Sequence, residues 1–172
     1  MEKRLSLAYL DQSGFALMLG QCYTWATKGR PLAIRSRFAS SGRTNLIGAF
    51  MIQGQSSTLY CRELNGNCSG LQVQAFIEDL AKTRQKADQM MVIVLDNAAF
   101  HKTKSIQEQR QVWEKSNVFL RFLPSYCPAL NYIENIWRKI KGFLMPRRCY
   151  DSLTELRAAL MVALTAIGGV II

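Results

Sequence analysis

The chain has 172 residues, a length that fits one compact domain with a sizeable core. Hydrophobic residues make up 49% and charged residues 20%, which excludes a disordered tail. With 22 Lys and Arg against 12 Asp and Glu, the net charge of +10 favours a polyanionic partner such as nucleic acid. One histidine, and five cysteines without a CxxC spacing, exclude zinc fingers and multi-histidine metal sites. The odd number of cysteines is typical of a reduced, cytoplasmic protein.

The first third of the chain is rich in strand patterns. Leu5, Leu7 and Tyr9 alternate with smaller residues, and this strand is expected to end at Asp11, where the turn residues 11–14 begin. Three further β-rich runs follow, at residues 22–26, 44–52 and 57–62. The last two are separated by Gly54 and predict a hairpin, so an antiparallel meander is expected.

Helices and strands alternate in the rest of the chain. We expect a helix after Gly70 that buries Val73, Phe76, Ile77 and Leu80 and ends near Asp88. Further elements are expected at residues 90–95 (a strand covered on both faces), 103–115 (a helix) and 118–123 (a strand). The next helix should bury one side, made of Ile133, Ile136, Trp137, Ile140 and Phe143. This order of elements predicts an α/β fold with a mixed sheet.

The last 15 residues are apolar, which is too short to cross a bilayer. Ser152 and Glu155 have capping-box spacing, so a buried last helix with a frayed end is expected, and no membrane partner.

Acidic residues are nearly absent from two long segments. No Asp or Glu occurs from Gln12 to Arg62, and only Glu134 occurs from Lys115 to Tyr150. Both segments carry several Lys and Arg residues. They favour a phosphate-facing surface, with ordinary solubilising charge as the alternative.

Two of the twelve acidic residues stand out by position. Asp11 and Asp96 each follow the last apolar residue of an expected core strand. Ligand sites of open α/β sheets gather at such strand ends, where two carboxylates could hold divalent ions. The alternative is that each Asp only starts a turn.

Glu134 has two structural alternatives to a role in chemistry. Asn131 and Glu134 have the spacing of a helix N-cap with its reciprocal glutamate. An exposed ion pair with Arg138, one helical turn further on, is also open.

Four ordered blocks resemble one known family. They read YLDQSGF, YTWATKGRP, VIVLDNAAFHK and LPSYCPALNYIENIWRKIK, and they run from about residue 7 to residue 145. The chain resembles the catalytic domain of mariner-related bacterial insertion-sequence transposases, which are DDE-type enzymes. This resemblance implies a ribonuclease-H-like fold, with a mixed five-stranded sheet flanked by helices. It implies that Asp11, Asp96 and Glu134 form a catalytic and metal-binding triad for two Mg²⁺ or Mn²⁺ ions.

Some positions depart from the family pattern. Gln12 replaces a usual Glu, Cys127 a usual Ser, and Tyr132 a usual Pro. Residues 1–172 are expected to be a single catalytic domain, without the N-terminal helix-turn-helix modules that family members usually carry.

The resemblance implies metal-dependent DNA cleavage and strand transfer on transposon ends and target DNA. The alternative is a catalytically silent, basic DNA-binding or multimerising remnant of a degraded element. A ribonuclease H shares the fold but should lack the last block. We also expect a homodimer in a DNA complex and a separately encoded DNA-recognition part. The expected location is the cytoplasm, in association with the nucleoid. DNA contacts are expected from Lys28, Arg30, His101, Lys102, Arg138 and Lys141.

Overall fold

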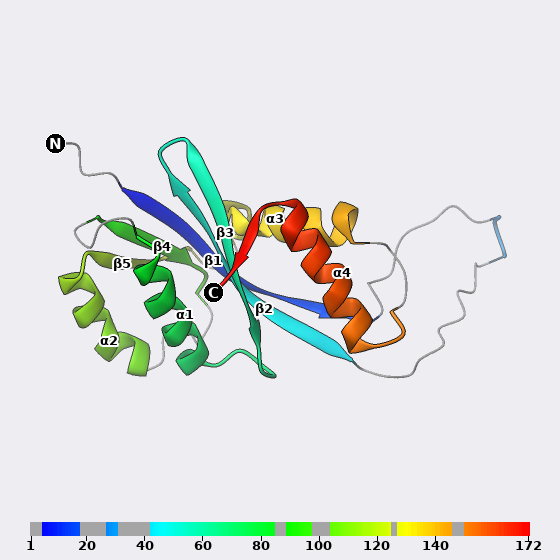
Figure 1. Cartoon of the computed structure of the whole chain (residues 1–172), viewed down its shortest axis with the longest axis horizontal. Helices are drawn as coiled ribbons and strands as arrows, with labels where there is room; N and C mark the ends of the chain where they lie inside the picture. The colour runs from blue at the N-terminus through cyan, green and yellow to red at the C-terminus, as the bar shows by residue number, and fades with distance from the viewer. Residues whose placement is uncertain are drawn as a thin grey trace.

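A six-stranded mixed sheet forms the centre of the computed structural model, which describes residues 5–17, 27–30, 42–84, 89–97, 104–124, 127–145 and 150–172 (Figure 1). The strands are β1 (Ser6–Ala16), β2 (Arg43–Gln53), β3 (Ser56–Leu64), β4 (Met91–Leu95), β5 (Val118–Phe122) and β6 (Gly169–Ile171). Their order across the sheet is β5-β4-β1-β2-β3-β6. The β1–β2 and β2–β3 pairs are antiparallel, and the other three pairs are parallel.

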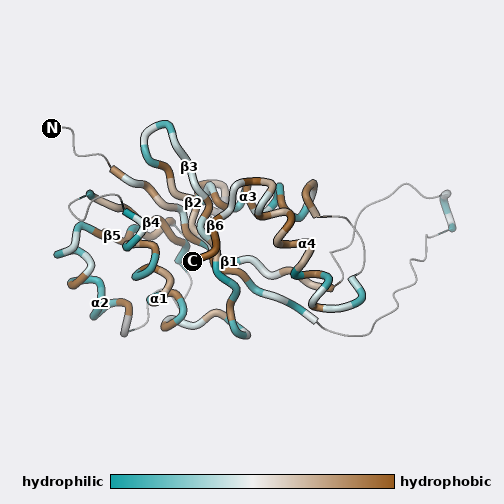
Figure 2. The backbone as a smooth tube through the Cα atoms, in the orientation of Figure 1, coloured by the Kyte–Doolittle hydropathy of each residue, from teal (hydrophilic) through white to brown (hydrophobic). Residues whose placement is uncertain are grey.

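Four α-helices cover the sheet, two on each face. They are α1 (Gly70–Lys82), α2 (Lys104–Lys115), α3 (Ile133–Lys139) and α4 (Leu153–Ala166). Helices α1 and α2 lie together at one end of the sheet in Figure 1, and α3 and α4 lie together at the other. Each pair has its own buried cluster. Along α2, teal and brown turns alternate in Figure 2, as expected of a helix with one buried side.

The covered face of β1 changes in the middle of the strand. Ala8 and Leu10 are buried in the cluster that contains α1 and α2, whereas Phe15 is buried in the cluster that contains α3 and α4. The pairing of β1 with β2 has no break, so side chains alternate between the two faces along the whole strand. What changes is which face of the strand is covered by helices. Asp11 lies at the change and is half-buried.

This change of face corrects one prediction. β1 does not end at Asp11 but continues to Ala16 as a regular strand. The expected hairpin is confirmed, with Gly54 in its turn at a φ of +61°, where an L side chain would be strained. The expected strand at 22–26 lies outside the described residues.

Three further element predictions need correction. β4 is covered fully on one face only, because Val92 and Val94 are half-buried rather than buried. Helix α1 buries the four predicted residues but ends at Lys82, well before Asp88. The chain end does not fray: it pairs with β3 as β6, which appears brown in Figure 2 and gives the sheet six strands instead of five.

The helix around Trp137 changes its winding. After α3, residues Ile140–Leu144 form a π-helical turn, in which the Met145 amide donates to the Ile140 carbonyl at 2.9 Å. The wider turn breaks the expected apolar side, and Phe143 is 83% exposed instead of buried.

Two helix starts carry side-chain caps. Ser152 caps α4 as predicted, but Glu155 accepts from the Asp151 amide instead of the Ser152 amide. A complete capping box joins Ser69 and Gln72 at α1, which sequence reasoning missed. Among the described residues, no helix is both long and apolar enough to cross a membrane.

Candidate functional site

One predicted aspartate lies in β1 and the other directly after β4, the neighbouring parallel strand. Ser6 pairs with Met91 and Tyr9 with Val94 in the β1–β4 register. Continuing this offset by two residues brings the backbone of Asp11 level with that of Asp96, which directly follows β4. Both aspartates are half-buried. Asp11 is therefore a mid-strand residue and Asp96 a strand-end residue, although the sequence predicted the same position for both.

Gly48 allows helix α3 to come close to Asp11. It is the cross-strand partner of Asp11 in the β1–β2 pair. A Cβ atom at Gly48 would lie 2.7 Å from Cη2 of Trp137 and 3.3 Å from Cδ1 of Ile133. The space beside Asp11 that a side chain would fill is thus occupied by α3, which carries Glu134.

A buried hydrogen bond ties the start of α3 to β1. The Asn131 Nδ2 group donates to the carbonyl of Leu10, the residue before Asp11, at 3.2 Å, and Asn131 is only 2% exposed. The cap prediction for Asn131 is wrong, because α3 begins after Tyr132 and has no side-chain cap. This bond holds the first turn of α3, including Glu134, beside Asp11.

The Glu134 carboxylate is unpaired within the described part of the fold. No hydrogen bond or salt bridge is formed between it and another described residue, so neither structural alternative is observed. Arg138 donates to Asn135 Oδ1 at 3.3 Å instead of pairing with Glu134. A half-buried carboxylate in the first turn of α3 is therefore left available for a ligand.

A lysine supplies positive charge near Asp11. The Lys141 ammonium lies 5.1 Å from the ring centroid of Phe15, and Phe15 itself packs edge-on against Trp137. The pKa of Lys141 is lowered, first by desolvation of its ammonium and then by the charge of Arg43, while Asp11 acts in the opposite direction. Lys141 therefore lies close enough to Asp11 for their opposite charges to interact.

The donor set fits a hard divalent cation, although the side chains are not yet gathered around one. Asp11, Asp96 and Glu134 offer only carboxylate oxygens, the ligands that Mg²⁺ and Mn²⁺ prefer. Within the described ranges, no three His, Cys, Asp or Glu side chains are close enough to hold a metal ion. Carboxylates repel one another when no cation is between them, so the fit rests on donor chemistry and backbone placement.

The expected DNA-contact residues are dispersed. Lys28 and Arg30 are exposed in the turn of residues 27–30, where the Arg30 amide donates to the Thr27 carbonyl. Arg138 is exposed on α3 and Lys141 on the turn that follows it. His101 and Lys102 lie outside the described residues. Of the six, Lys141 is the one with a described link to Asp11.

A family comparison identifies the chain. The model of the DDE superfamily endonucleases matches residues 6–157, which include β1, β4 and α3. The chain belongs to this family. The part matched contains all three predicted acidic residues. A search of curated protein sequences finds no match.

Solved structures share the fold of this DDE-family chain. The Mos1 transposase paired-end complex with left transposon end aligns with a TM-score of 0.66 at 15% identity, covering 95% of this chain and 48% of that one. The Mos1 mariner paired-end complex with Mn gives 0.65 at 16% identity, with the same coverages. The Mos1 strand transfer complex gives 0.63 at 16% identity, again covering 95% and 48%. The chain therefore spans about half the length of these proteins, and the predicted ribonuclease-H-like fold class is confirmed.

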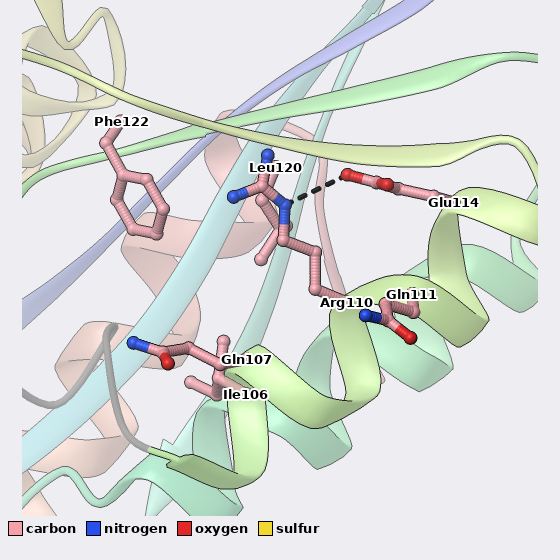
Figure 3. A pocket seen from close by; sticks show the side chains of 7 residues that line it. All are labelled: Ile106, Gln107, Arg110, Gln111, Glu114, Leu120 and Phe122. Carbon is pink, nitrogen blue, oxygen red and sulfur yellow. Dashed lines mark hydrogen bonds and ion pairs between the residues drawn. The ribbon is translucent and has the colours of Figure 1, made fainter.

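A separate hollow of the DDE-family fold does not serve the site. It has a volume of about 560 Å³ between α2 and β5, and Figure 3 shows Arg110, Gln107 and Gln111 around it. Arg110 Nε donates to Glu114 at 2.9 Å, so the two charged groups at this hollow are paired with each other. Leu120, which lines the hollow, belongs to the cluster of α1 and α2, on the face opposite to Trp137.

Sequence reasoning missed the residues that position the site. Gly48 and Asn131 hold α3 beside Asp11, but a glycine inside a strand and a polar residue before a helix each carry several meanings. Phe15 also escaped notice, because the strand was expected to end before it. Among the described residues, only the strand register and the tertiary contacts reveal these roles.

Proposed function

We propose that this chain is the catalytic core of a transposase-type enzyme that cuts and rejoins DNA with divalent metal ions. Asp11, Asp96 and Glu134 would hold the ions. The observation that carries the proposal is the β1–β4 register, whose continuation sets Asp11 level with Asp96, with α3 held alongside by Asn131. Membership of the DDE superfamily endonucleases supports the same chemistry.

The chemistry divides between the ions and the protein. Two Mg²⁺ or Mn²⁺ ions, when bound, would lower the pKa of a water and stabilise the charge on the leaving oxygen. The chain's own residues would orient the ligands: the β1–β4 pair would hold the two aspartates, and the packing of Trp137 against Gly48 would hold the turn that bears Glu134. Lys141 would offer its ammonium to a DNA phosphate near Asp11.

The substrate is proposed to be DNA, with transposon ends and target DNA as its two forms. One of the similar Mos1 structures is a complex with a transposon end, and another is a strand transfer complex. The net charge of +10 supports a polyanionic substrate for this chain. Residues 1–172 are proposed to act as one catalytic domain that assembles as a homodimer on DNA.

One observation favours a second candidate function. The net charge of +10 equally suits a catalytically silent remnant that only binds DNA or multimerises. The two candidates differ in a single property, which is cleavage that depends on a divalent metal.

The test is a nicking assay on supercoiled plasmid with Mn²⁺ or Mg²⁺. Asp96→Asn and Glu134→Gln should each lower the rate about 100-fold or more, because a group that stabilises transition-state charge is lost. Glu108→Gln is the control, since Glu108 only pairs with Lys104 at 3.7 Å on the exposed side of α2. Melting curves without metal should show no loss of stability in Glu134→Gln, because removing a charge relieves repulsion.

Three outcomes separate the alternatives. Normal cleavage by Asp96→Asn or Glu134→Gln would show that the triad assignment is wrong. DNA binding without metal-dependent cleavage by the unmodified chain would favour the silent remnant. An equal loss in Glu108→Gln would mean that the assay reports general damage instead of the site.

A further inference from the structure

Three aromatic rings form a cluster on the sheet face that carries Asp11. Tyr9 of β1 and Phe50 of β2 are direct cross-strand partners. Tyr132 lies over both: its ring centroid is 5.4 Å from that of Phe50 at an interplanar angle of 20°, and 6.1 Å from that of Tyr9 at 42°. The Tyr132 and Phe50 rings are therefore stacked, and Tyr9 completes a three-ring surface.

The outermost ring remains largely open to solvent. Tyr132 is 49% exposed, although Ile133 beside it is fully buried. A tyrosine that stacks on a neighbour and still exposes half of its surface can accept a further flat group.

The cluster adjoins the proposed site at two points. Tyr9 precedes Asp11 by two residues on β1 and points to the same face, because strand side chains alternate. Two residues of a strand span about 6–7 Å. Tyr132 precedes Glu134 by two residues at the start of α3. A nucleotide next to a phosphate held at Asp11 would therefore reach the rings with its base.

We propose that Tyr9, Phe50 and Tyr132 form a stacking platform for an unpaired DNA base beside the cleaved phosphate. This proposal rests on the proposed function, because it names where that substrate's base would lie. Proteins that bind single-stranded DNA combine aromatic rings, which stack on the bases, with cations that follow the backbone. Lys141, on the same face near Asp11, supplies such a cation.

The test measures base stacking directly and needs no metal. A short single-stranded oligonucleotide carrying 2-aminopurine is titrated with the full chain, and both its fluorescence and its affinity are followed. The unmodified chain and Tyr132→Phe should quench the fluorescent base. Tyr132→Ala should lose the quenching and weaken affinity about 5- to 100-fold. Binding to fully paired duplex should change less than twofold.

Two variants serve as controls. Phe143→Ala removes an aromatic ring that is 83% exposed in the π-helical turn, outside the platform, and should leave quenching and affinity unchanged. Tyr132→Leu keeps apolar volume over Phe50 but has no ring, so it should fold even where Tyr132→Ala does not. It should still lose the quenching.

The results that would overturn the platform differ from those that would overturn the triad. Unchanged quenching in Tyr132→Leu, or equal weakening of single strand and duplex, would show that Tyr132 only covers Phe50. Quenching by a chain that never cleaves DNA would leave the platform standing and reject the proposed catalysis. Metal-dependent cleavage by a chain that does not quench the fluorescent base would support the proposed catalysis and reject the platform.

Discussion

Gly48 lies opposite Asp11 in the β1–β2 pair, and the Trp137 ring occupies the space that its side chain would need. Gly48→Ala would place a methyl group 2.7 Å from Trp137 Cη2, so either the ring or α3 must move. We expect a loss of about 1–3 kcal/mol in the free energy of unfolding, as for other overpacked cores. Urea denaturation measures this loss.

A double-mutant cycle provides the control for Gly48→Ala. Trp137→Phe removes the outer ring atoms that meet the new methyl group, so the double variant should be more stable than the sum of the two single effects predicts. Strictly additive losses would show that the ring does not meet residue 48. Metal-dependent cleavage by Gly48→Ala should fall beyond its loss of folded protein, because α3 carries Glu134.

For single residues, the sequence predicts which side chains could take part in chemistry better than it predicts where they lie. Asp11 and Asp96 could be singled out because acidic residues are scarce and these two follow apolar runs. Their equal level in the sheet could not be predicted, since it depends on the register between β1 and β4, which are 75 or more residues apart in sequence. The role of Glu134 remains a prediction.

The elements show where sequence patterns fail for physical reasons. The apolar alternation of β1 stops at Asp11 because the helix cover moves to the other face, so a continuous strand looks like two different patterns. Phe143 was placed on the buried side with a period of 3.6, and the π-helical turn changes that period. Strand β6 was unpredictable because three residues gain a strand's stability only from β3.

A substitution at Asn131 can distinguish a helix-capping role from a hydrogen bond that holds α3 against β1. Asp caps helices as well as Asn does, but an ionised Asp cannot donate a hydrogen bond. Asn131→Asp should therefore lower the free energy of unfolding by about 1–3 kcal/mol near neutral pH, because the bond to the Leu10 carbonyl is lost and a buried charge is added. The loss should shrink at acidic pH, where the carboxyl regains a proton to donate.

The matched control for Asn131→Asp is Ser69→Asp. Ser69 is a true cap, which accepts from the Gln72 amide, so an aspartate there should leave stability within about 0.5 kcal/mol. Thermal melting at several pH values compares both variants. If Asn131→Asp were as harmless as Ser69→Asp, Asn131 would be a cap after all, and the tether from α3 to β1 would be wrong.

Across the described part of the molecule, the acidic residues that form salt bridges lie away from the proposed site. The described salt bridges join α1 to β3, lie along α1 and α2, and join α4 to β3, and none includes Arg43, Arg138, Lys139 or Lys141. Apart from Arg62, which pairs with Asp79, the cations of the nearly acid-free segments form no salt bridge with an acidic residue in the described part of the fold. The uneven distribution of charge could be predicted from the sequence, because recognising it does not require the pairing register of the strands.

The free cations predict how DNA affinity depends on salt. Binding to duplex DNA should weaken as salt rises, with a log–log slope of about −0.9 for each phosphate neutralised. Arg138→Ala combined with Lys141→Ala should reduce the slope by about two contacts, because both cations are exposed and neither forms a salt bridge with a described residue. Lys104→Ala is the control. Because Lys104 is already paired with Glu108 on α2, this variant should leave the slope unchanged.

Fluorescence anisotropy at a series of salt concentrations measures all three proteins. A slope near zero for the unmodified chain, or an equal reduction in Lys104→Ala, would show that these cations solubilise the protein without facing DNA.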